Sequence, residues 1–306
     1  MSTKILDTLH SASSTNPTST VTLVTHKGRF HSDDVMATAI LRFFFDSRGI
    51  PTKTIRTYTP EKEGYTDDTP NCIVYDIGLG QYDHHQADEA AKHTYRFDVI
   101  GEGVDKQTLV RKYAAVGLIW KEIGEPWIGS KKLADEIYER VIKYIDDTDN
   151  GFAPNPFSSL IHDYNPKNGD DKIYNTAFEE AVNMAYRLIS RTIEVAKSKK
   201  ESIDKLTAIA VKDAPYIITP EFMEGADDVC REYNIPFYIY PNDRIENGWC
   251  IKTINKYEGN NSIHIKDIPD EVRNWKDVTF LHPSCFLAAC IGAERACEIA
   301  TMLANK

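Results

Sequence analysis

The stretch that decides the fold is Val21-Thr-Leu-Val-Thr-His26-Lys-Gly-Arg-Phe-His31-Ser-Asp33-Asp34-Val35. Its β-branched opening, from Val21 to Thr25, predicts a buried strand, and an apolar helical pattern from Asp33 to Ser47 follows. Two histidines and two aspartates therefore lie where a strand ends and a helix begins. In open α/β sheets the ligand crevice lies at the carboxyl ends of the strands. We expect a ligand site at this position.

Three later segments carry side chains of the same kind: Val74-Tyr75-Asp76, Tyr82-Asp83-His84-His85-Gln86 and Asp146-Asp147-Thr148-Asp149-Asn150-Gly151. We expect all four segments to meet at one metal centre. Carboxylates suit hard divalent cations and imidazole suits manganese, iron, cobalt or zinc, so a set without thiols favours manganese over structural zinc. Two such ions about 3.5–4 Å apart need a bridging carboxylate. Asp76, at the end of the most buried strand, is best placed to bridge.

Each segment also has an ordinary structural explanation. A histidine after a strand is commonly a hydrogen-bonded core residue, and Asp33 with Asp34 could cap the following helix. The Asp83-His84-His85 string could form a turn, and Asp149-Asn150-Gly151 is itself a turn signal. The coincidence of four such sites at strand or helix ends favours the metal centre. Asp34 and Asp146 are second choices as ligands, because the loop register is open to short shifts.

The order strand, helix, strand, strand predicts an α/β fold with a mostly parallel sheet in the first half of the chain. The 306 residues suit two cores, because single cores seldom exceed roughly 250 residues. We expect four parts: a flexible arm over 1–18, a metal-binding catalytic domain over 19–170, a helical connector over 171–204, and a smaller α/β substrate-binding domain over 205–306.

Periodicity predicts the individual elements within these parts. In the first domain we expect strands over 52–58 and 71–77, an irregular stretch over 86–104, helices over 108–123 and 131–144, and a loop over 155–172. The connector should be one amphipathic helix over 176–200. In the second domain we expect strands over 207–211, 237–240, 249–254 and 278–281, with a more antiparallel arrangement, and a final helix over 293–303.

Composition limits the function classes. The net charge of −10 argues against broad non-specific nucleic-acid binding, although a local basic cleft including Lys27 and Arg29 stays compatible. No apolar run approaches the ~20 residues of a membrane span, so no membrane partner is expected. The six cysteines form no CxxC pair, which favours reduced thiols in an intracellular, cytoplasmic protein. A mitochondrial or nuclear location is not excluded, and neither is assembly into a homodimer.

These motifs carry a resemblance. Asp83-His84-His85 after a strand ending at Asp76, with the opening stretch before it and Asp149-Asn150-Gly151 after it, resembles the DHH phosphoesterase superfamily. Within that superfamily, the string from Thr25 to Asp34 resembles the MYG family of exonucleases. The likeness continues through Ala-Val-Gly-Leu-Ile at 115–119, Asn165-Pro166, Trp249 and the segment 280–282. It thus covers most of the chain.

The resemblance implies a DHH-type catalytic domain with two Mn²⁺ ions per chain, for which Mg²⁺ is a substitute. It assigns one ion to His26, His31 and Asp76, and the other to Asp33, Asp76, His84 and Asp149. His85 would contact the scissile phosphate or act as an acid beside Asp76. Arg273 and His282 of the second domain would contact the substrate, since arginine can hold a phosphate with two hydrogen bonds.

One departure from the family pattern affects the function. Where the family has Gly-Gly-His, this chain has Ala288-Ala289-Cys290, which removes a polar side chain and restricts close backbone approach. The resemblance implies a hydrolase, a 3′-5′ exoribonuclease acting through a two-manganese-activated water. Two alternatives stay open: a hydrolase of short oligonucleotides or small phosphates such as pyrophosphate, and a catalytically impaired RNA-binding protein.

Overall fold

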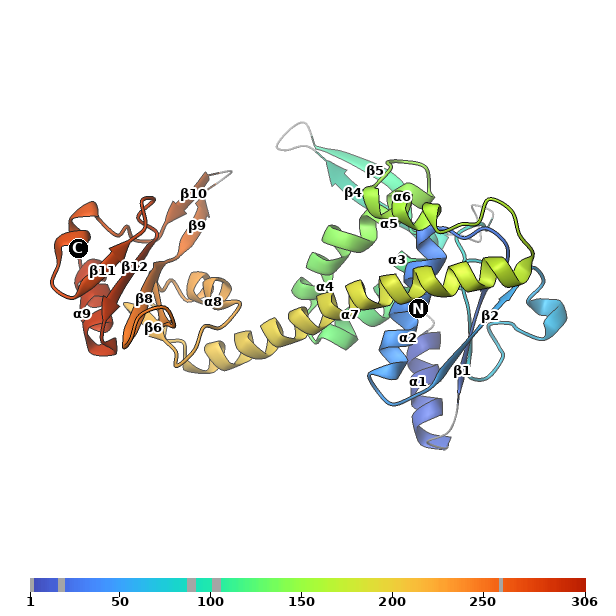
Figure 1. Cartoon of the computed structure of the whole chain (residues 1–306), viewed down its shortest axis with the longest axis horizontal. Coiled ribbons are helices and arrows are strands. Elements are labelled where there is room, and N and C mark those ends of the chain that lie inside the picture. The colour runs from blue at the N-terminus through green and yellow to red at the C-terminus, as the bar shows by residue number, and fades with distance from the viewer. Residues whose placement is uncertain (1–2, 16–19, 87–91, 101–105, 259–260) are drawn as a thin grey trace. The chain divides into compact units, whose positions relative to one another are not determined.

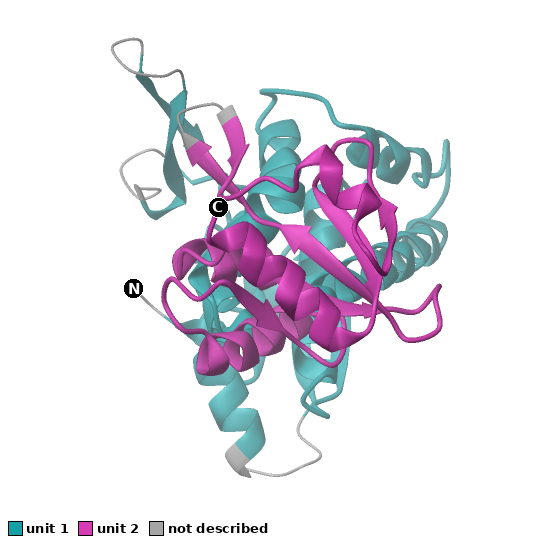
Figure 2. Ribbon diagram, turned by 90° about the vertical axis from the view of Figure 1, so that its left-hand side faces the viewer, with its two compact units in different colours: residues 1–196 teal, residues 197–306 magenta. Residues whose placement is uncertain are grey.

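The structure, a computed structural model, describes residues 3–15, 20–86, 92–100, 106–258 and 261–306 (Figure 1). The fold is mixed α/β, as the sequence predicts. The chain divides into two compact units, residues 1–196 and 197–306 (Figure 2). The division lies within the long helix α7 (Asp171–Ile209), which extends beyond the expected 176–200. Among the described residues no helix combines the length and apolar character needed to cross a membrane.

A parallel sheet forms the base of unit 1. The strands β1 (Val21–His26), β2 (Thr52–Thr57) and β3 (Cys72–Val74) lie in the order β2-β1-β3, and both pairings are parallel. The helix α2 (Ser32–Asp46) connects β1 to β2 and is buried along most of its length. The predicted strands, helix and parallel pairing are confirmed, although β3 is shorter than predicted. This arrangement brings the ends of β1 and β3 to the same edge of the sheet.

An antiparallel hairpin follows the parallel sheet in the chain. It replaces part of the irregular stretch predicted over 86–104 and the first residues of the helix predicted over 108–123. It consists of β4 (Tyr95–Ile100) and β5 (Gln107–Lys112), and the helix α3 begins only afterwards (Ala115–Ile128). The irregular prediction is wrong for 95–100, and the helix prediction is wrong for 108–112. Alternating side chains along both strands suit an extended ribbon better than a helix. Residues 87–91 and 101–105 lie outside the described residues.

Two further corrections concern the helices after α3. The predicted helix over 131–144 comprises α4 (Lys131–Ile137), a π-helical turn (Tyr138–Ile142) and α5 (Lys143–Asp149), so it includes the acidic segment instead of stopping before it. The predicted loop over 155–172 contains α6 (Pro156–Asp163). The side chain of Asn155 accepts a hydrogen bond from the Ser158 amide, a helix cap that places proline at the first helical position.

The expected flexible arm is wrong for the part that the structure describes. Residues Lys4–Thr15 form the helix α1, and Ile5 is fully buried. The amides of Ile5 and Leu6 donate hydrogen bonds to the Glu122 carboxylate, at 2.8 and 3.1 Å. That acceptor lies on α3, far away in the sequence, so local composition gave no signal of it.

Unit 2 contains a five-stranded sheet in the order β11-β12-β8-β7-β6, parallel only between β6 and β7. Its elements are β6 (Tyr216–Ile218), α8 (Ala226–Glu232), β7 (Phe237–Asn242), β8 (Gly248–Thr253), β9 (Asn255–Glu258), β10 (Asn261–His264), β11 (Val278–Leu281), β12 (Leu287–Ile291) and α9 (Ala293–Ala304). The largely antiparallel arrangement and the final helix are confirmed. The strand predicted over 207–211 is wrong, because α7 continues through Ile209.

Candidate metal centre

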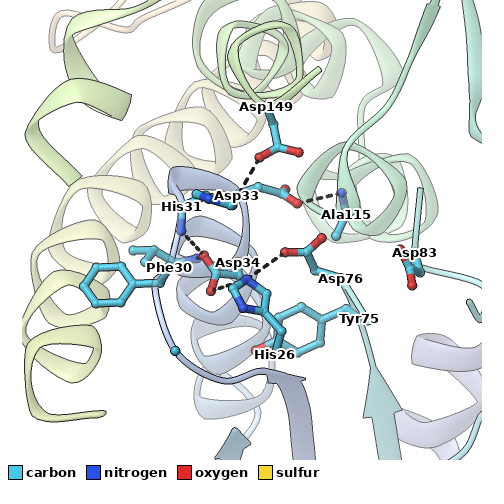
Figure 3. Close-up of polar contacts among 12 residues, drawn as sticks. His26, Phe30, His31, Asp33, Asp34, Tyr75, Asp76, Asp83, Ala115 and Asp149 are labelled. Atoms are coloured by element: carbon cyan, nitrogen blue, oxygen red, sulfur yellow. Dashed lines mark hydrogen bonds and ion pairs between the residues drawn. The ribbon is translucent and has the colours of Figure 1, made fainter. Parts of the chain in front are cut away.

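Four segments bring histidine and aspartate side chains together in unit 1 (Figure 3). His26 ends β1, Asp33 and Asp34 lie in the first turn of α2, and Asp76 follows β3. The remaining side chains come from the chain after residue 82 and from the end of α5. The first segment is placed by the parallel pairing of β1, which aims its terminal histidine at the sheet edge where β3 also ends.

The first group consists of His26, Asp34 and Asp76. The His26 Nε2 atom lies 3.2 Å from Asp34 Oδ2 and 3.3 Å from Asp76 Oδ2. Burial opposes protonation of His26, but hydrogen bonds to the two carboxylates raise its pKa to about 11. The other oxygen of Asp34 accepts the amides of His31 and Val35, at 2.8 and 3.0 Å, which fixes the carboxylate at the start of α2.

The second group consists of Asp33, His84 and Asp149. The His84 Nε2 atom lies 3.0 Å from Asp149 Oδ2. Asp33 is completely buried and accepts the amides of Ala115 and Val116, at 3.0 and 2.7 Å, so the beginning of α3 holds it in place. Burial and the charges of nearby carboxylates raise the pKa of Asp33 well above its ordinary value.

Asp76 connects the two groups. Its Oδ2 faces His26, while its Oδ1 lies 3.8 Å from His84 Nδ1. Its backbone is left-handed, with φ at 53°, and its amide donates to the Tyr82 carbonyl at 2.9 Å. The carboxylate thus lies between the groups, in the position that a bridging ligand would need. Burial raises the pKa of Asp76.

His85 lies at the exposed side of this cluster, with 60% of its side chain accessible. Its Nδ1 atom lies 2.8 Å from Asp83 Oδ1, and its amide donates to the same oxygen. Although burial acts in the opposite direction, the His85 contacts lower the pKa of Asp83, and the Asp83 hydrogen bond raises the pKa of His85. An ionised Asp83 makes Nδ1 the donor, so Nε2 is the ring nitrogen that this contact does not engage.

The side chains in this cluster fit the binding of divalent cations. In the part of the chain that the structure describes, Asp76 Oδ1 and His84 Nδ1 are buried atoms without a hydrogen-bond partner. Buried polar atoms are normally paired, because an unpaired one loses its hydration without compensation. Several carboxylates in one buried cluster also repel one another unless positive charge compensates them. Carboxylate oxygens with imidazole nitrogens are suitable ligands for manganese or magnesium.

The predicted ligand His31 lies at the edge of the cluster, and the second-choice ligand Asp146 has other partners. The His31 side chain is largely exposed, and its Nδ1 atom is 3.9 Å from Asp149 Oδ1, while Asp34 takes the position beside His26. Asp146 accepts hydrogen bonds from the Ala114 amide at 3.0 Å, from Tyr138 at 2.8 Å and from Arg96 at 3.1 Å. Burial raises the pKa of Asp146 to about 7. Asp146 thus anchors the start of α3 rather than joining either group.

The two basic residues proposed as substrate contacts lie in the loop after β1. Lys27 pairs with Asp171, and the Arg29 Nη2 atom lies 2.9 Å from His162 Nε2. A cavity of about 430 Å³ adjoins this loop and the metal cluster. It is lined by residues that include His31, Asp149, Ser159 and His162. Sequence reasoning did not identify His162.

The other predicted contacts belong to unit 2. Arg273 pairs with Asp270, and His282 Nδ1 accepts the Ser284 amide at 3.1 Å. The side chains at positions 288–290, where the family has Gly-Gly-His, are buried in the strand β12. Ala288 and Cys290 both belong to the core that α9 covers. The departure therefore changes the packing of a central strand.

The supporting roles of several residues around the cluster were not predicted from the sequence. Asp83 anchors His85, Arg96 holds Asp146, and Asn165 exchanges two hydrogen bonds with the Phe30 backbone, at 3.0 and 2.8 Å. The acidic pair before Thr148 was a usable signal for Asp146. The partners of Arg96 and Asn165 depend on contacts between distant segments, so no local pattern indicates them.

Comparison with known families gives a match over most of the chain. Residues 22–303 match the family model MYG1_exonuc, which is described as Uncharacterised protein family (UPF0160). A MYG1 protein of Schizosaccharomyces pombe is 21% identical over 238 residues, covering 66% of this chain and 68% of that protein. The human MYG1 exonuclease is 30% identical over 146 residues. That alignment covers 42% of this chain and 35% of the human protein.

Solved structures give a weaker likeness. RecJ of Thermus thermophilus, crystallised with Mn²⁺, aligns over 99% of this chain and 54% of its own, with 9% identity and a TM-score of 0.29. The crystal structure of the same protein with Mg²⁺ aligns with 10% identity and a TM-score of 0.26. TM-scores of this size carry no argument about this chain.

Proposed function

This chain belongs to the MYG1_exonuc family (UPF0160), and from that premise we propose that it is a metal-dependent phosphodiesterase. More narrowly, we propose a DHH-type catalytic domain that binds two Mn²⁺ ions and removes nucleotides from the 3′ end of RNA. The family membership supports a nuclease, and the relatives in mammals are named exonucleases. The RNA substrate and the 3′-5′ direction rest on the resemblance of the sequence motifs.

The observation that carries the proposal is the position of Asp76 between two ligand groups. His26, Asp34 and Asp76 form one group, and Asp33, His84 and Asp149 form the other, with the candidate ligand atoms of each group within 4.8 Å of one another. When bound, two cations joined by a shared carboxylate supply the charge that stabilises phosphoryl oxygens and activates water. We assign these six residues as ligands, with His31 as an outer contact.

The remaining residues have defined tasks in this proposal. His85, held by Asp83, presents Nε2 to the substrate and gives a proton to the departing oxygen or binds a phosphate oxygen. The beginning of α3 fixes Asp33 through two amides, so the carboxylate keeps its position during the reaction. Arg29, which is exposed beside the cavity, would bind a phosphate of the strand end.

The test uses the full chain with Mn²⁺ and single-stranded RNA of increasing length, labelled at the 5′ or 3′ end. We expect stepwise release of mononucleotides from the 3′ end. Asp76→Asn should lower the rate by about 100-fold or more, because it removes the shared carboxylate. Asp204→Asn, a change at an exposed carboxylate on α7, is the matched control and should leave the rate unchanged.

The products distinguish the alternatives. Hydrolysis restricted to very short oligonucleotides or pyrophosphate would replace the exoribonuclease by a hydrolase of small substrates. RNA binding without cleavage by the wild-type chain would contradict a phosphodiesterase and favour a binding protein. Release of nucleotides from the 5′ end would retain the chemistry and overturn the direction.

A further inference from the structure

One side of the hairpin β4–β5 directs charged side chains to the rest of unit 1, and the other side exposes apolar side chains. Each side is mixed, because Ile100 and Leu109 share the side of Arg96 and Thr108 shares the side of Phe97. Figure 1 shows the hairpin extending from the body of unit 1, with its base near α5. In antiparallel ribbons the side that packs on the protein is normally apolar and the solvated side polar. This hairpin reverses that pattern, so its two sides need separate explanations.

The inner side is charged and anchors the hairpin. Arg96 and Arg111 are directly opposite in the pairing of the two strands, and their side chains share one side with Asp98. Arg96 forms ion pairs with Asp146, at 3.1 Å, and with Asp147, and Arg111 lies 3.0 Å from Asp147. The polar inner side is therefore explained by its attachment to α5.

The outer side carries an exposed row of apolar side chains. Phe97 is opposite Val110 in the pairing, and Val99 follows two positions after Phe97 on the same side. Phe97, Val99 and Val110 are 68, 62 and 58% exposed. Tyr95 precedes Phe97 by two positions on this side, and the Lys112 Nζ atom lies 5.4 Å from its ring. Two aromatic rings on one side of a strand are thus about 7 Å apart along it.

We propose that this outer side, formed by Tyr95, Phe97, Val99, Val110 and Lys112, is a base-stacking surface for single-stranded nucleic acid. The inference rests on the proposed function and identifies where the strand beyond the reacting end is held. Proteins that bind single strands use aromatic rings on exposed strands as platforms for successive bases.

The size of the surface argues for bases over a second protein copy. A fully covered aromatic side chain buries about 150–250 Å². Three exposed apolar side chains therefore fall short of the ~800 Å² that each partner contributes to a stable interface. A surface of this size does suit one or two nucleobases, whose flat faces are no larger than an aromatic side chain.

The position of the surface also favours this assignment. Ala115, whose amide donates to the ligand Asp33, follows Val110 by five residues, which bounds their separation to about 18 Å. The Asn150 side chain also donates to the Lys112 carbonyl at 3.2 Å, so the base of the hairpin is joined to the residue after Asp149. A strand held on Phe97 would thus begin within a few nucleotides of the metal cluster.

The experiment measures binding separately from cleavage. A fluorescein-labelled 12-nucleotide single-stranded RNA is titrated with the full chain in EDTA, and binding is followed by anisotropy. Phe97→Ala should raise the dissociation constant about tenfold, while Phe97→Trp should retain binding, because any aromatic face supports stacking. Tyr257→Ala, a change at a similarly exposed aromatic residue on the hairpin β9–β10, is the matched control and should have no effect.

Turnover of a dinucleotide gives the second measurement. A dinucleotide has a single nucleotide beyond the scissile phosphate and lacks the longer strand that this surface would hold, so Phe97→Ala should hydrolyse it at the wild-type rate. For the 12-nucleotide substrate the same variant should raise KM and leave kcat unchanged. Because Phe97 is exposed, circular dichroism should show wild-type folding and melting.

The outcomes separate this inference from the proposed function. Unchanged RNA binding by Phe97→Ala, no RNA binding by the wild-type chain, or equal loss of dinucleotide turnover overturns the stacking surface. A dimer that Phe97→Ala dissociates, with RNA binding unaffected, would assign the surface to a second copy instead. Binding that depends on Phe97, in a chain that cleaves no substrate, would support the surface and refute the phosphodiesterase.

Discussion

Asp76 has a left-handed backbone conformation, and its carboxylate lies between the two ligand groups. Its φ of 53° is a left-handed conformation that aspartate and asparagine adopt more readily than most other residues. The loop depends on this conformation, because it lets the Asp76 amide reach the Tyr82 carbonyl. The carboxylate, by contrast, is used only inside the cluster. Backbone and side chain can therefore be tested separately.

Asp76→Asn should preserve the fold and abolish strong metal binding. Asparagine keeps the left-handed backbone but removes the negative charge, so we expect Mn²⁺ affinity to fall by about 100-fold with little change in thermal stability. Asp76→Ala should show the same loss of affinity and an additional destabilisation of about 1 kcal/mol from the strained backbone. Calorimetric titration with Mn²⁺ and urea unfolding measure the two effects.

Asp213 offers a matched control, because it is also an aspartate with a left-handed backbone, at φ 59°, but lies in unit 2. Asp213→Asn should change neither Mn²⁺ affinity nor stability appreciably. Full Mn²⁺ affinity in Asp76→Asn would remove the bridging carboxylate from our account of the site.

Gly117 has no room for a side chain. A Cβ atom at this position would lie 2.3 Å from Asp146 Oδ2, and Asp146 is held by Tyr138, Arg96 and the Ala114 amide. We expect Gly117→Ala to lower the free energy of unfolding by about 1–3 kcal/mol, although alanine is the better helix former. Denaturant unfolding measures the change.

A double-mutant cycle provides the control for this clash. In an Asp146→Ala background the obstructing carboxylate is absent, so Gly117→Ala should be neutral or stabilising there. An equal destabilisation in both backgrounds would mean that the loss arises from another contact of the helix α3.

At the scale of secondary structure, local patterns were sufficient where the burial pattern was regular. The buried run from Val21 to Thr25 and the apolar periodicity of α2 identified the first strand, the first helix and the ends that carry His26 and Asp33. Residue type indicated the segments that carry His84 and Asp149, and the family resemblance singled out these two residues within them. The strands β1 and β3 follow a simple pattern, because a parallel sheet covered on both faces favours continuous apolar strands.

The elements that the sequence missed depend on distant partners. The strand β4 is held by the Arg96 contacts to Asp146 and Asp147, which come from α5. The helix α1 is capped by Glu122 on α3. Asp34, not His31, lies beside His26. The hydrogen bond from the His31 amide to Asp34 holds the carboxylate there, and ligand spacing in the sequence does not indicate it.

Glu122 is the residue on which the attachment of α1 depends. Its carboxylate accepts the amides of Ile5 and Leu6 and also pairs with the Tyr82 hydroxyl. Glu122→Ala leaves the Leu6 amide without its acceptor and the Ile5 amide with only the Tyr82 hydroxyl, at 3.3 Å, so we expect a loss of about 1–3 kcal/mol and faster amide hydrogen exchange throughout Lys4–Thr15. Exchange measured by mass spectrometry on peptides from this helix gives the local readout.

Glu125→Ala is the matched control, because Glu125 is exposed on the same helix α3. It should leave exchange in α1 unchanged. Unaltered protection of α1 in Glu122→Ala would show that the buried contacts of Ile5 are sufficient to hold the helix.

At the scale of the whole molecule, the candidate metal ligands lie in one unit only, although each unit has a hydrophobic core. Every residue of the two ligand groups belongs to unit 1, whereas unit 2 has cores of its own, built around Phe237 and Tyr238. A ligand stabilises only the structure that binds it. The two units should therefore respond differently to metal, even though α7 contributes to both.

Scanning calorimetry with and without Mn²⁺ tests this difference. At a Mn²⁺ concentration about 100-fold above the dissociation constant, binding adds about 2.7 kcal/mol to the stability of the folded state. For a unit of this size that corresponds to an increase in Tm of about 5–10 °C. We expect this increase for unit 1 alone, with the transition of unit 2 unchanged and the shift reversed by EDTA.

Two variants decide how the calorimetric result is interpreted. Asp76→Asn should abolish the shift, since it removes the carboxylate that lies between the two groups, whereas Asp270→Asn, an exposed change in unit 2, should retain it. Equal shifts in both transitions would mean that Mn²⁺ also binds unit 2 or that the two units unfold together through α7. A shift that persists in Asp76→Asn would place the bound ion outside the cluster, because the variant lacks the carboxylate between the two groups and a cation buried there would have less negative charge to compensate it.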